Sequence, residues 1–106
     1  MKPDEKETLT AEEQAAIFAA FSDPTRLKLV KILTGQKIPG SLCVNALASL
    51  VGVSQSAVSQ HMRILKNIGL VSGERQGYRI HYSINHDALE RCHDVVISAL
   101  SIDDNN

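Results

Sequence analysis

Between Gln55 and Gly69, apolar residues recur at steps of three and four, which is the spacing of one buried face of a helix. These apolar positions are Val58, Met62, Leu65 and Ile68. The other positions carry side chains that can hydrogen-bond to base edges or phosphates, and the candidates are Gln55, Ser56, Ser59, Gln60, His61 and Arg63. Glutamine can pair with adenine and arginine with guanine, so this pattern favours a DNA-reading helix over an ordinary solvated helix face.

A second, shorter apolar segment precedes this helix. Residues Leu42 to Val51 are predicted to be helical, and Gly52 and Val53 form a tight corner after them. The hydroxyl of Ser54 suits the N-cap of the following helix, which Gly69 can terminate. Helix, glycine turn and polar-faced helix together predict a helix-turn-helix, in which the second helix enters the major groove.

The period changes after Gly69. Residues 70–75 and 79–84 flank a glycine-containing turn, and the second segment alternates apolar and polar residues, which predicts a β-hairpin. Arg75, Gln76 and Arg79 lie at its tip. A basic hairpin after a DNA-reading helix is typical of a wing that contacts phosphates or a narrow minor groove. The alternative is a hairpin that only covers the edge of the core.

Two helices are predicted before this motif. Thr10 and Glu13 form a capping box that begins a helix ending at about Phe21, with an apolar side of Ala15, Ile17, Phe18 and Ala19. Ser22 or Asp23 can cap a second helix from Pro24 to about Leu33. That second helix is expected to bury Leu27, Val30 and Leu33 and to present Arg26, Lys28 and Lys31 to water or phosphate.

The last helix is predicted from Asp87 to Leu100, with an apolar face of Leu89, Cys92, Val96 and Ala99. The expected fold is mostly α with a small β-hairpin: a winged helix-turn-helix of order α-α-α-α-β-β-α over residues 10–100. Residues 1–9 and 101–106 are expected to be a disordered arm and tail. The winged core needs neither terminal helix, so these amphipathic helices are predicted to pair in a two-fold homodimer. Packing within one chain is the alternative.

The composition is consistent with one small aliphatic domain. The chain has 106 residues, no tryptophan and 43% apolar residues. It shows no apolar run long enough to span a bilayer and no signal peptide, so a cytoplasmic protein without a membrane partner is expected. Cys43 and Cys92 should then be thiols rather than a structural disulfide.

The net charge of −1 is unevenly distributed along the chain. Residues 1–23 and 83–106 each carry −4, whereas residues 24–51 carry +4 and residues 52–82 carry +3. The positive segments are the ones predicted to hold DNA. Because the total charge is weak, recognition is expected to depend on two half-sites of a palindromic operator that a dimer binds together.

Four segments, in order, resemble the signatures of the ArsR/SmtB family of winged-helix repressors. They are Phe21–Val30 (FSDPTRLKLV), Ser41–Leu47 (SLCVNAL), Val53–Leu65 (VSQSAVSQHMRIL) and, for the wing and its entry, Gly69–Val71 with Arg75–Ile84. The resemblance covers roughly residues 11–100. It implies a homodimer with the first and last helices at the interface, and repression by occupying an operator. It also implies that DNA is released when an inducer binds or modifies the dimer.

The resemblance does not supply the inducer. Metal-sensing relatives use two cysteines in the segment where this chain has Cys43 and Asn45, and one thiolate with one amide is a poor site for a soft metal. A second family site on the last helix would fall near Ala99 and Ile102, which cannot coordinate metal. No cofactor is therefore expected to be required.

Two local inducer sites are left as hypotheses. His86, Glu90 and His93 share one stripe of the last helix and could hold Zn or Ni, alone or across the dimer, although such a stripe is more often simply solvated. Cys92 could form a thiol switch with Cys43 or with Cys92 of the second subunit through disulfide or persulfide formation, although a buried thiol more often only packs. A repressor without either kind of inducer is the third alternative.

The sequence favours a DNA-binding repressor over two other classes of protein. An enzyme is not expected, because the sequence has no glycine-rich phosphate loop, no Ser/His/Asp set and no paired carboxylates in a pocket-forming context. A winged helix that only binds proteins would be expected to lose the basic wing and the small polar side chains of the recognition helix. Both are present here.

Overall fold

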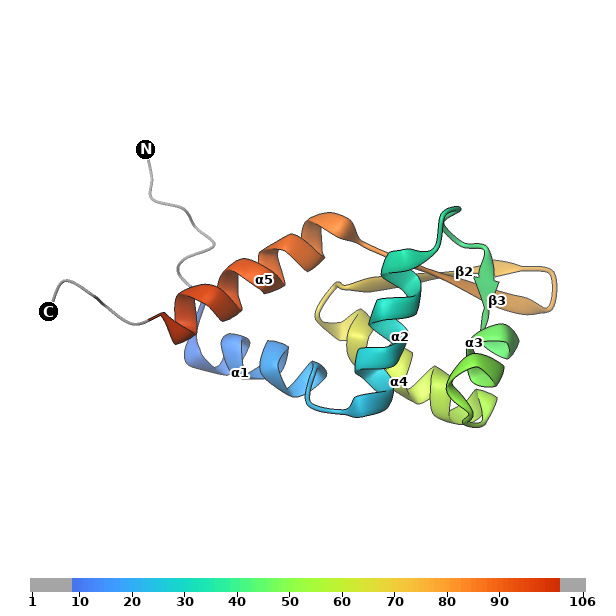
Figure 1. The fold of residues 1–106 in the computed structure, drawn as a ribbon, viewed down its shortest axis with the longest axis horizontal. Coiled ribbons are helices and arrows are strands. Elements are labelled where there is room, and N and C mark those ends of the chain that lie inside the picture. The colour runs from blue at the N-terminus through green and yellow to red at the C-terminus, as the bar shows by residue number, and fades with distance from the viewer. Residues whose placement is uncertain (1–8, 102–106) are drawn as a thin grey trace, which may run out of the picture.

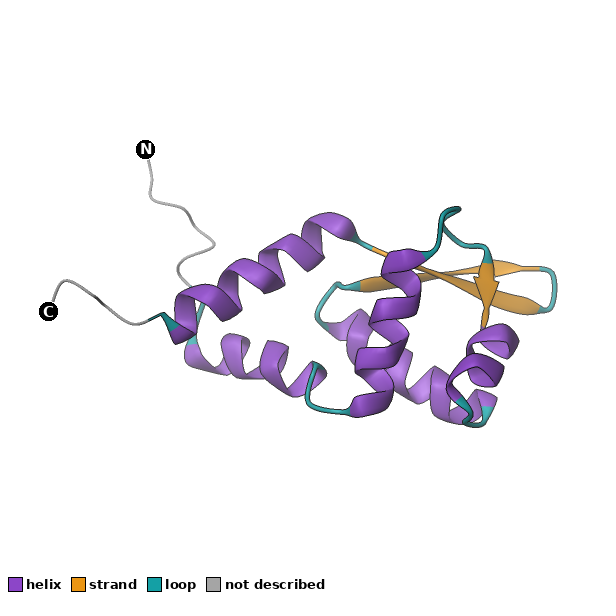
Figure 2. Ribbon diagram, viewed as in Figure 1, coloured by secondary structure: helices purple, strands orange, loops and turns teal. Residues whose placement is uncertain are grey.

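A computed structural model describes residues 9–101, which form five helices and three short strands (Figures 1 and 2). The helices are α1 (Ala11–Ala20), α2 (Pro24–Gly35), α3 (Val44–Val51), α4 (Gln55–Asn67) and α5 (His86–Leu100). The strands are β1 (Leu42–Cys43), β2 (Val71–Gln76) and β3 (Arg79–Ile84). The predicted winged helix-turn-helix is confirmed. Of the segments expected to be disordered, residues 1–8 and 102–106 lie outside the described part.

Local side-chain caps begin the helices. Thr10 accepts a hydrogen bond from the amide of Glu13, and the Glu13 carboxylate accepts one from the amide of Thr10, which confirms the capping box. Asp23 caps α2 by accepting from the amides of Thr25 and Arg26. Asn85 caps α5 in the same way, so that helix begins one residue earlier than predicted.

The sheet contains a strand that the sequence analysis missed. Residues 42 and 43 were predicted to be the start of a helix, but they form β1, which pairs antiparallel with β3. The strand order is β1-β3-β2. A two-residue strand has no period of its own, and it forms because β3 offers a free edge at Tyr82 and His81. In the same region, the side-chain amide of Gln36 donates a hydrogen bond to the Tyr82 carbonyl (3.1 Å).

The core lies between the helices and one face of this small sheet. The fully buried large side chains are Leu29, Leu33, Leu47, Val58, Met62, Leu65 and Leu70. In α2 the expected buried face was wrong at one position, because Leu29 is fully buried whereas Leu27 is 42% exposed. The face that α2 buries is set by its packing against α3, α4 and β3, which the helical period alone does not specify.

α5 packs along α1 at the end of the molecule away from the wing (Figure 1). Its buried residues are Ala88, Cys92 and Val95, with Leu89 and Val96 half-buried, so the predicted apolar face is shifted and Ala99 is exposed. Large apolar side chains on α5 remain exposed at Ile97 and Leu100. None of the helices between residues 9 and 101 has the length and apolar character needed to cross a membrane.

Candidate nucleic-acid interface

The turn between α3 and α4 sets the direction of the predicted recognition helix. Gly52 ends α3 in the left-handed region, with φ of 73°, a conformation that glycine adopts at no steric cost. Two residues later the Ser54 hydroxyl accepts a hydrogen bond from the amide of Ala57 (3.0 Å) and caps α4. α4 ends at Asn67, followed by half-buried Ile68 and by Gly69 with φ of 76°. The predicted helix, turn and cap are therefore confirmed.

α4 has one buried face and one exposed polar face. Val58, Met62 and Leu65 are each fully buried. Five of the predicted DNA-contacting residues are exposed on the same helix, namely Gln55, Ser56, Ser59, Gln60 and Arg63. Burial of the apolar face fixes which side of the helix is free, so these hydrogen-bonding side chains are available to a ligand.

The hairpin of β2 and β3 projects from the domain beyond α3 and α4 (Figure 1). Gly77 and Tyr78 form its two-residue turn, and Gly77 has the positive φ (67°) that tight hairpins favour. Arg75, Gln76 and Arg79 are exposed at the tip, as predicted. Midway along β3, where β1 pairs with it, the His81 imidazole Nδ1 lies 2.8 Å from the Gly40 carbonyl. That carbonyl can only accept, so Nδ1 carries the proton.

Tyr78 is a candidate contact that was not among the residues predicted from the sequence. Its side chain is 100% exposed at the tip of the hairpin, between Gly77 and Arg79. An aromatic ring fully in water beside an arginine gains from burial in a partner, because its large apolar surface favours leaving water. The signal in the sequence was an aromatic residue directly after the turn glycine.

His61 and Arg26 occupy a position different from the one predicted. Both were expected to face DNA or water, but His61 is only 21% exposed and its Nδ1 lies 3.1 Å from Nη1 of Arg26. Arg26 also donates from Nε to the Ala20 carbonyl (2.8 Å) and from Nη2 to the Ala19 carbonyl (3.2 Å). The helical period of each segment could not show this contact, because it joins residues 35 positions apart.

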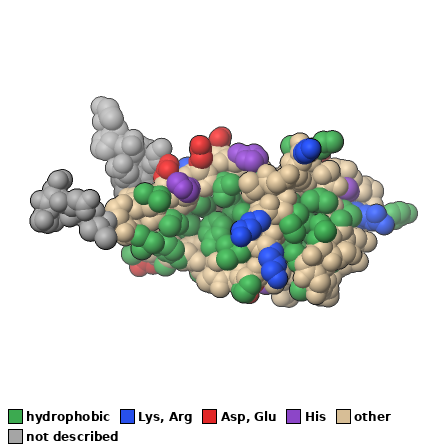
Figure 3. Space-filling model, viewed as in Figure 1, with side chains coloured by type: hydrophobic (Ala, Val, Ile, Leu, Met, Phe, Trp, Pro, Cys, Tyr) green, Lys and Arg blue, Asp and Glu red, His purple; other side chains and the backbone are tan. Residues whose placement is uncertain are grey.

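Charged side chains are segregated in space as well as along the chain. On the face shown in Figure 3, acidic side chains gather over α5, whereas lysine and arginine lie over α2 and at the hairpin end. The exposed acidic residues of α5 are Asp87, Glu90 and Asp94. A DNA duplex is therefore repelled from the α5 end and attracted to the other.

The two cysteines lie in different environments. Cys43 is the buried N-cap residue of α3, and the amides of Ala46 and Asn45, with the charge of Arg79, lower the pKa of its thiol below the ordinary value although desolvation opposes them. Burial raises the pKa of the Cys92 thiol, an effect that Arg91 partly offsets. Both are free thiols. β1 lies beside the hairpin and α5 along α1, so this arrangement does not favour a bond between Cys43 and Cys92 of the same chain (Figure 1).

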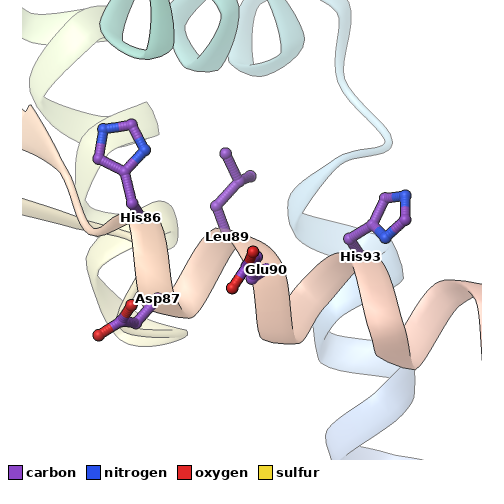
Figure 4. Close-up of a pocket in the computed structure, with 5 residues that line it drawn as sticks. All are labelled: His86, Asp87, Leu89, Glu90 and His93. Carbon is purple, nitrogen blue, oxygen red and sulfur yellow. The ribbon is translucent and has the colours of Figure 1, made fainter.

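The predicted metal stripe is solvent-exposed on α5. His86, Glu90 and His93 line a shallow surface pocket of about 400 Å³ with Asp87 and Leu89 (Figure 4). The two imidazoles extend from the same side of the helix and start about 10 Å apart along its axis, two turns from each other. Within residues 9–101, no three potential ligands come together around a common point. A single chain thus does not assemble the predicted site.

Residues 23–72 match the family described as "Bacterial regulatory protein, arsR family". Among similar proteins are a cadmium resistance regulatory protein CadC homolog of Staphylococcus aureus (32% identical) and a transcriptional repressor SmtB homolog of Synechocystis (42% identical). The matches cover 73% and 72% of this chain, but only 61% and 56% of those relatives' lengths. The transcriptional repressor SdpR of Bacillus subtilis is 31% identical over 85% of this chain and 96% of its own length.

Solved structures show the same fold. NolR from Sinorhizobium fredii is 32% identical and superposes with a TM-score of 0.66, covering 97% of this chain and all of that one. A homodimeric winged helix-turn-helix DNA-binding domain from Mycobacterium bovis gives the same TM-score at 23% identity, covering 92% of this chain and 87% of that domain. At that identity the likeness is one of fold.

Proposed function

The chain belongs to the arsR family of bacterial regulatory proteins. We propose that it is a homodimeric repressor that binds a palindromic operator in double-stranded DNA. The observation that carries the proposal is the exposed set of short polar side chains on α4, whose opposite face is fully buried. A helix held in this way presents hydrogen-bonding groups of the size that fits a major groove. The family is one of transcriptional regulators, not of enzymes.

Different residues of the interface are proposed to contact bases and phosphates. Ser56, Ser59 and Gln60 contact base edges, and Gln55 and Arg63 contact bases or phosphates. On the wing, Arg75, Gln76 and Arg79 contact phosphates or the minor groove. His61 is proposed to act through Arg26 and not at the DNA, because its imidazole is turned to that side chain.

The dimer is proposed to form through α1 and α5. These helices contact each other within the chain, yet Ala15 and Ala19 on α1 and Ile97 and Leu100 on α5 remain exposed. A second copy would cover such apolar positions by two-fold symmetry. Two recognition helices would then face successive half-sites on one side of the duplex.

Replacing Gln60 with alanine tests base reading. We expect a loss of discrimination of about 1–3 kcal/mol at one base pair of each half-site, which is roughly 5- to 150-fold in the affinity ratio. Fluorescence anisotropy on DNA from upstream of the protein's own gene, and on the same DNA with single base changes, measures that ratio. Asn67→Ala, an exposed amide at the end of the same helix, is the control and should leave discrimination unchanged.

Two results would count against this assignment. Unchanged operator preference in Gln60→Ala would remove Gln60 from the base contacts. Wild-type affinity that does not fall with salt would argue against DNA binding as such and favour a protein-interaction module, because phosphate contacts release counterions and apolar docking does not.

Tyr78 is proposed to enter the DNA interface at the wing tip. The chain has two tyrosines, and Tyr82 is 5% exposed in the core whereas Tyr78 is fully exposed. In protein labelled with 3-fluorotyrosine, we expect operator DNA to shift the fluorine NMR signal of Tyr78 and to leave the signal of Tyr82 nearly unchanged. Tyr78→Ala should weaken operator binding by about 1 kcal/mol, roughly fivefold, and Tyr78→Phe should not. A Tyr78 signal that stays constant at saturating DNA would exclude the contact.

The inducing signal is proposed to be thiol oxidation or persulfidation, with metal binding as the second candidate. The different surroundings of the two thiols support the first, since only Cys43 has a pKa lowered by helix amides and a nearby arginine. A bond between Cys92 residues of two subunits would act directly on the α5 helices. For a metal, the stripe of His86, Glu90 and His93 would need ligands from the second subunit, because one chain does not bring three together.

Oxidation of the metal-free protein separates these candidates. Diamide takes two electrons and two protons from a pair of thiols, and we expect the oxidised dimer to release operator DNA in the anisotropy assay. Cys92→Ser should remain bound if Cys92 is the switch, and mass spectrometry should show iodoacetamide reacting first at Cys43, whose thiolate forms more readily. Equal affinity of reduced and oxidised protein would contradict the thiol switch and direct the search to Zn or Ni.

A further inference from the structure

Arg26 joins three helices through one guanidinium group. From the first turn of α2 it donates two hydrogen bonds to α1, at the carbonyls of Ala19 and Ala20, and its remaining Nη1 lies 3.1 Å from His61 on α4. Ala20 is fully buried, so this end of α1 is fixed in the core. A planar guanidinium with donors in fixed directions transmits orientation between its partners better than a flexible lysine would.

The chemistry of the contact fixes the state of the His61 ring. Arginine has donors only, so Nδ1 of His61 must be the acceptor and the ring proton lies on Nε2. Nε2 lies 3.9 Å from the Asp23 carboxylate, so the ring is held between Arg26 and Asp23, both at the start of α2. Desolvation raises the pKa of Asp23, but amide hydrogen bonds from Arg26 and Thr25, together with the charge of Arg26, outweigh it and lower the pKa below its ordinary value. Asp23 is therefore ionised at neutral pH.

This cluster lies between the two functional parts of the molecule. α1 carries part of the proposed dimer face, and α4 carries the proposed base-reading residues. Among the contacts that the structure gives for residues 9–101, the Arg26 side chain is the one that hydrogen-bonds to both α1 and α4. A change in the position of the Arg26 side chain therefore alters hydrogen bonds to both helices at once.

We propose that Arg26 is a positioning residue that fixes the orientation of the recognition helix α4 relative to the dimerisation helix α1 through His61. Its role rests on the proposed function, because orientation matters when two recognition helices must fit two half-sites at a set spacing. Arg26 does not contact DNA. Its effect is on the fit of the dimer to the operator, and His61 and Arg26 act as one unit.

The test compares Arg26→Met with Lys28→Met, which removes the same charge from an exposed position on the same helix. Operator affinity is measured by anisotropy at several salt concentrations, on the operator and on a version with one base pair inserted between the half-sites. We expect Arg26→Met to bind the operator about tenfold more weakly, with the salt slope of the wild type, and to lose most of its preference for the correct spacing. Lys28→Met should keep that preference.

Variants at His61 give a second, independent test of the contact between Arg26 and His61. His61→Leu removes the acceptor and should reproduce the Arg26→Met result, whereas His61→Gln keeps an acceptor and should retain most of the spacing preference. The double variant Arg26→Met/His61→Leu should be little worse than either single one, because both remove the same interaction. If Arg26→Met does not fold by circular dichroism, the comparison of His61→Leu with His61→Gln decides the question.

Two results would overturn the proposal while leaving the proposed function intact. One is a salt slope reduced by about one unit in Arg26→Met with equal losses on both DNAs, which would make Arg26 a phosphate contact. The other is a test variant that shows the same spacing preference as its control, whether Arg26→Met matches Lys28→Met or His61→Leu matches His61→Gln. If the wild type itself shows no salt-dependent binding to any operator fragment, the proposed function and this inference fail together.

Discussion

Leu65→Ala is expected to lower the free energy of unfolding by about 2–5 kcal/mol. Leu65 is fully buried on α4, in contact with the core beneath the recognition helix. Removing its side chain loses apolar burial and leaves a cavity that a close-packed interior closes only in part. Because small domains are stable by about 5–15 kcal/mol, this change removes a large part of the total.

Denaturant unfolding followed by circular dichroism measures this loss. Leu50→Ala is the matched control, because Leu50 is 61% exposed on α3, and a substitution there should change stability by no more than about 0.5 kcal/mol. The core assignment would be wrong if the two variants unfolded at the same denaturant concentration. Operator binding by Leu65→Ala should recover when the temperature is lowered toward that of maximum stability, since the polar face of α4 is unaltered.

Arg75→Ala/Arg79→Ala is expected to weaken DNA binding roughly 50-fold at about 0.1 M salt, from the loss of counterion release at two phosphates. Both arginines are exposed at the hairpin tip, on adjacent strands. The loss should be similar on operator and unrelated DNA, because phosphate contacts carry no base information. The slope of log affinity against log salt should become shallower by about two units.

Anisotropy titrations over a range of salt concentrations measure this slope. Arg91→Ala removes the same side chain from an exposed position on α5 and should leave the slope unchanged, provided sedimentation shows an intact dimer. A double wing variant with the wild-type slope would show that the hairpin only covers the core edge. A loss confined to the operator would instead indicate base reading by the wing.

Local signals in the sequence determined most of the fold. The capping box at Thr10 and Glu13 and the cap at Ser54 each involve residues three apart, so the sequence shows both partners of the contact. The steps of three and four in α4 and the alternation in β3 depend only on the period of the backbone. For the same reason the exposed polar residues of α4 and the basic wing could be predicted without the structure.

Tertiary structure decided the features that depend on distant partners. β1 forms because β3 has a free edge, and Leu29 rather than Leu27 is buried because α3, α4 and β3 lie on that side of α2. Arg26 and His61 carry charge or polarity that suits DNA, and only the packing of α1, α2 and α4 turns them toward each other. A periodic pattern specifies a face within one element, whereas the partner of that face is chosen by the free energy of packing the whole chain.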